Sequence, residues 1–234
     1  MCSSIKKFDI VYSKNDSLPD SFLENLDIQL INAFKAGKEF FFRDIEGKFP
    51  EIYQFLIDKM QELVIVGHHG GSEILYHWAL CSDEFNIYSS MPMSWRKEKI
   101  KRIDKAYCDA LPDYLLPFYY GFDGFDFSGK GHLGLHESGF LLNFSNWYGM
   151  KHIVEYSAIG DEGREDFINE FSRSDIRIIL RQENGKVAFI DKSKNLEGVW
   201  KGTWGELGKY KKVDNPIEFF NDSFFETVKS FKNG

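Results

Sequence analysis

The chain is long enough to fold around a core of its own, and its composition is that of a globular protein. Its 234 residues are 43% hydrophobic, 28% charged and 17% aromatic, which excludes a disordered chain and a small domain that depends on disulfides. A net charge of -7 and an isoelectric point near 5.4 disfavour a nucleic-acid partner, because that binding relies on clustered Lys and Arg. The acidity suits a basic protein partner and also serves solubility.

Cysteine usage and hydropathy bear on the compartment. The 3 cysteines, Cys2, Cys81 and Cys108, are odd in number and widely spaced, which fits neither a disulfide framework nor a metal knuckle. The amino terminus has no apolar signal segment, and no apolar run approaches the ~18 residues of a membrane span. We expect a soluble, cytoplasmic protein without a membrane partner.

The first part of the chain predicts two helices followed by strands. Apolar residues recur at steps of three and four from Ser17, the expected cap, to Gly37, and a second helix begins at Pro50. Residues 62–81 form two apolar runs around a glycine turn, which predicts a strand pair. A further strand within 86–92 precedes a basic connector.

The stretch LPDYLLPFYYGFDG, residues 111–124, is interrupted by a second proline. Pro117 removes a backbone donor and clashes with the preceding turn, so one continuous helix is excluded and a restart at Pro117 is expected. Extended segments are expected at 139–144 and 151–159. An acidic helix within 160–175 follows and places its apolar residues inward: Phe167, Ile168 and Phe171.

The carboxy-terminal part contains the clearest local patterns. Two strand-like runs flank Asn184-Gly185, a pair that favours a two-residue hairpin turn. The last helix is expected to begin with Asn215 as cap and Pro216 at its first position. Its inward face is predicted from the apolar spacing: Ile217, Phe220, Phe224, Val228 and Phe231. Helices and strands mix without a βαβ alternation, so we expect an α+β fold with largely antiparallel sheets and amphipathic helices packed on them.

Adjacent histidines in GHHGGS, residues 67–72, are the strongest candidates for chemistry. Neighbouring residues of a strand point to opposite faces, so His68 and His69 do not share an ion there. His77 approaches in a hairpin and Glu73 lies nearby, which leaves a metal site as an alternative. No nucleophile elbow or phosphate-binding loop is present, and we expect neither catalytic residues nor a cofactor.

Carboxylates gather in two places. A run of acidic residues on an amphipathic helix is more typical of a solvated face than of an acid–base pair, and it can also dock a basic protein. The residues that we assign to such docking are Asp161, Glu162, Glu165 and Asp166, then Asp123 and Asp126. The aromatic and basic segment 199–213 reads as buried tryptophans on edge strands with lysines outside, which discourage aggregation.

Two stretches resemble the SUKH superfamily, whose bacterial members are mostly immunity proteins. IVGHHGGSEILYHWA is similar to its glycine turn and following strand, with Gly70, Gly71 and Glu73 at matching places. LPDYLLPFYYGFDG is similar to its Leu-Pro start, apolar helix and closing Asp-Gly. NGKVAFID and the terminal aromatic helix resemble its late elements. The order of these motifs predicts two diverged copies, in units 1–105 and 106–234, with one continuous domain as the alternative.

The resemblance implies a function as well as a fold. A protein of this kind is not an enzyme, but binds a cognate antibacterial toxin domain, neutralises it by occluding its active site, and acts in bacterial competition. The acidic residues assigned above would steer a toxin with a basic surface. The alternative is a metal- or nucleotide-dependent enzyme centred on GHHGGSEILYH.

Overall fold

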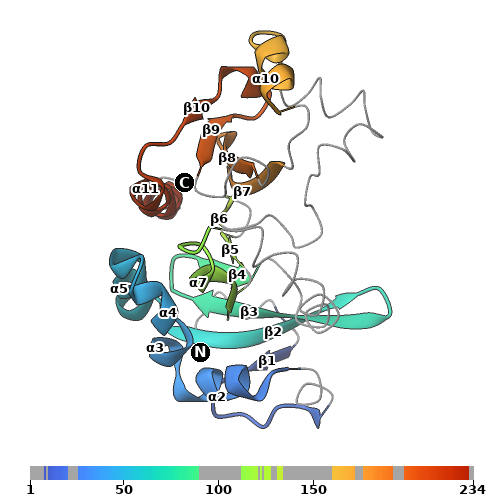
Figure 1. The fold of residues 1–234 in the computed structure, drawn as a ribbon. Helices are drawn as coiled ribbons and strands as arrows, with labels where there is room; N and C mark the ends of the chain where they lie inside the picture. Colours follow the sequence, from blue (N-terminus) through green and yellow to red (C-terminus); the bar gives the residue numbers. More distant parts are fainter. Residues whose placement is uncertain are drawn as a thin grey trace.

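The computed structural model has an α+β fold built on an antiparallel sheet, as the sequence predicts (Figure 1). The structure describes residues 8, 10–20, 26–89, 112–120, 122, 124–127, 131–133, 160–171, 176–191 and 198–231. The predicted basic connector, the extended segments at 139–144 and 151–159, Cys2 and Cys108 lie outside these residues.

In the described chain the sheet has ten strands that pair in sequence order. The strands are β1 (Ile10–Tyr12), β2 (Glu62–Gly70), β3 (Glu73–Cys81), β4 (Asn86–Ser89), β5 (Phe125–Asp126), β6 (Gly131–Leu133), β7 (Ile176–Gln182), β8 (Lys186–Asp191), β9 (Val199–Thr203) and β10 (Lys211–Lys212). Every neighbouring pair is antiparallel. The predicted hairpin of residues 62–81 is confirmed as β2–β3, and the strand expected within 86–92 is β4.

Most of the helices cover one face of the sheet. They are α2 (Ile28–Ala36), α3 (Lys38–Phe41), α4 (Arg43–Glu46), α5 (Pro50–Lys59), α7 (Pro117–Tyr120), α10 (Arg164–Phe171) and α11 (Pro216–Ser230), with a 3-10 turn, η5 (Leu207–Lys209). Figure 1 shows α3, α4 and α5 beside the first strands and α11 beside the later ones. The restart at Pro117 is confirmed by α7.

The main core lies between this helical layer and the sheet. Ile52 and Leu56 of α5 are fully buried, and Trp78 of β3 packs at steep angles against Phe34 of α2 and Phe41 of α3. Strand alternation gives the sheet two faces. In β8, Ala188 and Ile190 belong to the main core, while Val187 and Phe189 belong to a second cluster with α10.

The main core contains residues from both predicted units, 1–105 and 106–234. Phe55 of α5 packs edge to face against Phe224 of α11 at 5.5 Å between centroids, and Phe85 stacks on Phe231 at 4.6 Å. The sheet continues across the same boundary because β4 pairs with β5. The division into two units remains a prediction, and the described parts of both share one sheet and one core.

Helix ends show where local patterns compete. Asn215 caps α11 as predicted, accepting from the Glu218 N–H at 3.3 Å. Ile217 was wrongly placed on the buried face: it lies at the margin of the stripe in the first turn and is 39% exposed. Ser17 does not cap the helix that ends at Gly37. Asp27 caps it, because its carboxylate accepts from the Gln29 N–H at 2.7 Å.

The β7–β8 hairpin is confirmed, but its turn is longer than predicted. The strands end at Gln182 and resume at Lys186, which leaves a loop of three residues. The Gly185 N–H donates to the Gln182 carbonyl at 2.9 Å, and Gly185 has a φ of 83°. A type I turn followed by a left-handed glycine explains the extra residue.

Candidate functional site

The acidic helix α10 is anchored by aromatic packing on the sheet face opposite α11. Phe167 and Phe171 are buried, as predicted, whereas the Ile168 side chain is outside the described part of the structure. Phe171 meets the rings of Phe189 and Trp200 edge to face, at 5.4 Å and 5.6 Å between centroids. These contacts turn the acidic residues outward.

Glycines hold the start of α10 directly against η5. A Cβ on Gly163 would lie 2.3 Å from the Gly208 carbonyl oxygen, and one on Gly208 would lie 2.1 Å from the Glu162 carbonyl oxygen. One on Gly160 would lie 2.5 Å from the carbonyl oxygen of Gly205. No side chain fits in this contact, so backbone meets backbone. Its sequence signal is a pair of GxxG segments, GDEG at 160–163 and GELG at 205–208, which our sequence analysis missed.

Two of the four acidic residues predicted for this helix precede its first residue, Arg164, and each of them lies beside a cation of the chain. A carboxylate oxygen of Asp161 lies 3.5 Å from the Arg164 guanidinium, and one of Glu162 lies 2.9 Å from the Lys209 ammonium. The hydrogen bond and charge of Glu162 raise the pKa of Lys209. Glu165 and Asp166 are exposed, and the described residues provide neither with an ion-pair partner. The acidic surface without a neighbouring cation in the described chain is therefore smaller than the sequence predicts, and it consists of Glu165 and Asp166.

Tyr210, directly after η5, contacts the last turn of α10. Its hydroxyl donates to Glu170, and burial, followed by that hydrogen bond, raises the pKa of Tyr210 to about 12. The Tyr210 ring also meets Phe171 at 5.2 Å between centroids. Tyr210 is therefore a neutral hydrogen-bond donor at physiological pH, and it fixes the acidic face to the core.

The second predicted carboxylate pair is separate from α10. Asp126 lies in β5, where it is half-buried and opposite Tyr88 and His132, and Asp123 is outside the described residues. Figure 1 shows β5 near the middle of the sheet and α10 beyond β8 and β9. Asp126 therefore does not extend the acidic face of α10.

The hairpin β2–β3 separates the adjacent histidines as predicted. His68 is opposite Leu75 and His69 is opposite Ile74, so the two rings leave the sheet on opposite faces. His68 instead meets His77, with ring centroids 5.2 Å apart and an interplanar angle of 19°. Burial lowers the pKa of His77 to about 4, against the effect of its hydrogen bond to Ser89, and His68 lowers it further. Among the described residues, no three His, Cys, Asp or Glu side chains gather around a common point.

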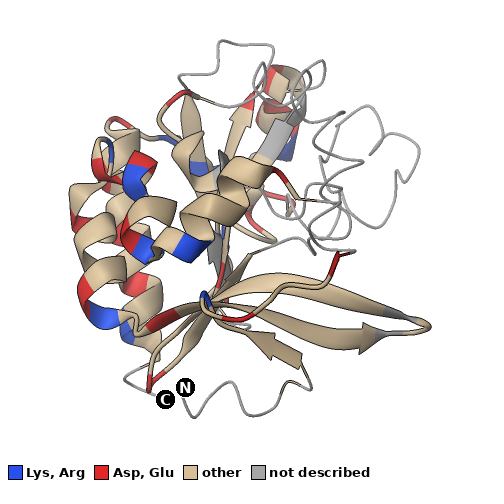
Figure 2. Ribbon diagram, turned by 90° about the horizontal axis from the view of Figure 1, so that it is seen from below, with Lys and Arg blue, Asp and Glu red and all other residues tan. Residues whose placement is uncertain are grey.

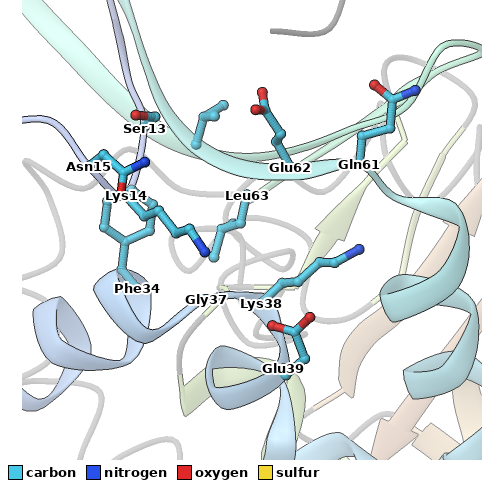
Figure 3. Close-up of a pocket in the computed structure, with 11 residues that line it drawn as sticks. Ser13, Lys14, Asn15, Phe34, Gly37, Lys38, Glu39, Gln61, Glu62 and Leu63 are labelled. Carbon is cyan, nitrogen blue, oxygen red and sulfur yellow. The ribbon is translucent and has the colours of Figure 1, made fainter.

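A hollow of about 250 Å³ lies where α2 meets α3, between the loop after β1 and the start of β2. Gly37 forms part of its wall, and a Cβ on this glycine would lie 3.0 Å from a Glu39 carboxylate oxygen and 3.7 Å from the Lys14 ammonium (Figure 3). The Lys38 ammonium is occupied, because it donates to carbonyls at the end of α5, including that of Leu56 at 3.4 Å. Burial lowers the pKa of Lys38. This mixed-charge hollow has no sequence signature.

Other expectations concern single residues. Cys81 is fully buried, as expected for a small apolar residue, and Trp200 of β9 is buried while the lysines of β10 are exposed. Lys211 pairs with Lys201 at the sheet edge. The structural interpretation of segment 199–213 is confirmed for Trp200 and the outer lysines, whereas Trp204 lies just after β9 and is only half-buried. No helix in the described ranges has the length and hydropathy needed to cross a membrane.

Comparison with known proteins identifies no relative. No protein-family model matches the chain, and no curated protein or solved structure is significantly similar to it.

Proposed function

We propose that the protein is a cytoplasmic immunity protein that binds a cognate toxin domain through the outer face of α10 and occludes its active site. One observation carries the proposal: Glu165 and Asp166 are exposed without an ion-pair partner in the described chain, on a helix that is otherwise fixed by buried rings and glycine contacts. The resemblance to SUKH immunity proteins supplies the kind of partner.

A fixed helix suits inhibition by a preformed surface. Residues that are already ordered lose little conformational entropy on binding, so more of the contact energy appears as affinity. The aromatic contacts of Phe167 and Phe171 and the Gly163–Gly208 approach provide this order. Acidic residues at the rim increase the association rate with a basic partner and make it sensitive to salt.

The ion pairs at the start of α10 indicate which acidic residues steer the partner. Glu162 already pairs with Lys209, so its carboxylate adds little net charge to the surface. Glu165 and Asp166 carry the steering effect, and Asn169 one turn later is also exposed. The expected partner surface is therefore a small group of Lys and Arg side chains.

The test begins with capture of the partner from lysate of the source organism at moderate salt. A stoichiometric protein with a toxin-like terminal domain is expected, and activity of that domain should fall on titration with this protein. The variant Glu165→Lys/Asp166→Lys should slow association and weaken its dependence on salt. Asp44→Lys/Glu46→Lys, on exposed positions of α4, makes the same charge change away from α10 and serves as control.

Three results would contradict the proposal. Inhibition with unchanged association kinetics in the α10 variant would remove α10 from the interface. A captured partner without toxic activity, or no stable partner at all, would remove the immunity function and favour the alternative centred on the histidine hairpin.

A further inference from the structure

The histidine pair lies on an arm of the sheet that extends beyond its neighbours. β1 pairs with β2 only from Ile65 to Gly67, and β4 pairs with β3 only from Ala79 to Cys81. Figure 1 shows β2 and β3 continuing past the ends of both strands. Residues 63–72 and 74–82 contain no charged side chain other than histidine. Figure 2, which colours Lys and Arg blue and Asp and Glu red, accordingly shows almost all of the described arm in tan.

We infer that His68 and His77 form a two-histidine site for a divalent transition-metal ion that prefers imidazole, such as Cu²⁺, Ni²⁺ or Zn²⁺. The two residues are diagonal neighbours on one face of the hairpin, because His68 is opposite Leu75 and His77 is opposite Val66. Water would complete the coordination. The site is independent of α10 and of the immunity function proposed above.

The separation of the rings matches a shared ion. With a metal–nitrogen distance of about 2.1 Å and a tetrahedral angle, two imidazoles on one Zn²⁺ have centroids about 5 Å apart. The observed separation of His68 and His77 is 5.2 Å. The backbone therefore holds both side chains at a suitable distance without rearrangement of the strands.

One ring has to turn for both nitrogens to point at the ion. The rings are stacked with an interplanar angle of 19°, so their planes do not converge in the present arrangement. His68 is exposed, and rotation about its χ2 torsion, which is broad for histidine, brings its ring plane toward the ion.

A hydrogen bond already sets the orientation of His77. Its Nδ1 lies 3.4 Å from the Ser89 carbonyl oxygen, which only accepts, so Nδ1 carries the proton. Nε2 then presents its lone pair. Metal-binding histidines commonly donate their second nitrogen to a carbonyl or carboxylate in this way, which fixes the tautomer and increases ligand basicity.

The ion class follows from the donors. Imidazole nitrogens suit Zn²⁺, Cu²⁺ and Ni²⁺, whereas Mg²⁺ and Ca²⁺ require oxygen ligands. Among these divalent ions affinity follows Ni²⁺ < Cu²⁺ > Zn²⁺, so Cu²⁺ should bind most tightly. Two protein ligands give moderate affinity.

The test uses protein that carries no polyhistidine tag and has been treated with a chelator. Cu²⁺, Ni²⁺ and Zn²⁺ are titrated into this protein by calorimetry, and the electron paramagnetic resonance spectrum of the Cu²⁺ complex is recorded. We expect a site with two coordinated nitrogens. His68→Ala should weaken binding at this site at least about tenfold, because a lost ligand costs no less than a lost outer partner. His69→Ala, the neighbour on the opposite face, is the matched control and should bind as the wild type does.

Some outcomes would overturn the inference. Equal binding by the wild type and His68→Ala places the ion elsewhere, as does an equal loss in His69→Ala. Absence of binding at millimolar metal removes the site. His77 is partly buried, so metal binding by His77→Ala is compared with the wild type at the same folded fraction. His68 is exposed, so its substitution should not affect folding, and the comparison of His68→Ala with the wild type is decisive.

Discussion

The contact between Gly163 and Gly208 predicts a large effect from a single methyl group. Gly163 has a φ of 70°, and an added Cβ would lie 2.3 Å from the Gly208 carbonyl oxygen. The left-handed conformation costs about 1–2 kcal/mol for an L residue. Relief of the overlap by backbone movement costs a further 1–3 kcal/mol or so, as in overpacked cores. Gly163→Ala should therefore lower the free energy of unfolding by about 2–5 kcal/mol.

Gly71→Ala separates the two contributions. Gly71 has a similar φ of 73°, but nothing lies within 4 Å of its Cβ position, so its substitution incurs the conformational cost alone. Both variants are compared with the wild type by urea unfolding, with the slope m as a check on two-state behaviour. Gly163→Ala should have the lower midpoint. Equal midpoints would refute the backbone contact that positions α10.

Two further predictions concern the core and the hairpin. Since the pKa of His77 is lowered from 6.5 to about 4, the folded state binds its proton less readily than the unfolded state. The free energy of unfolding therefore keeps its full value above the unfolded-state pKa and decreases as the pH falls toward the folded-state pKa. At pH 5 the decrease is about 2 kcal/mol. We would measure urea unfolding at pH 5 and above the unfolded pKa of 6.5. His77→Gln should abolish the loss of stability at pH 5, whereas His69→Gln should retain it. Phe224→Ala should cost about 3–5 kcal/mol, because this fully buried ring contacts Phe55 and Phe127 at 5.5 Å and 5.3 Å between centroids. Phe225→Ala, at a partly buried neighbour, should cost less, and equal losses would contradict the assigned core.

Local patterns in the sequence determined most of the elements. Proline at a first helical position located α5 and α11, alternation around glycines located β2–β3, and the spacing of Phe167 and Phe171 oriented α10. These signals act over a few residues, because helix and strand periodicities and caps depend on near neighbours. Errors arose where two local signals competed. Asp27 replaced Ser17 as cap, and the β7–β8 turn took one more residue than its Asn-Gly pair implied.

The α+β class and the separation of His68 from His69 were therefore decided by sequence alone, through the mixture of periodicities and the two-residue repeat of a strand. Only the tertiary structure decided that Glu162 would meet Lys209. It also brought the GxxG segments of residues 160–163 and 205–208 into backbone contact. Such encounters depend on strand register and chain closure over long separations, which no short-range pattern of residues records.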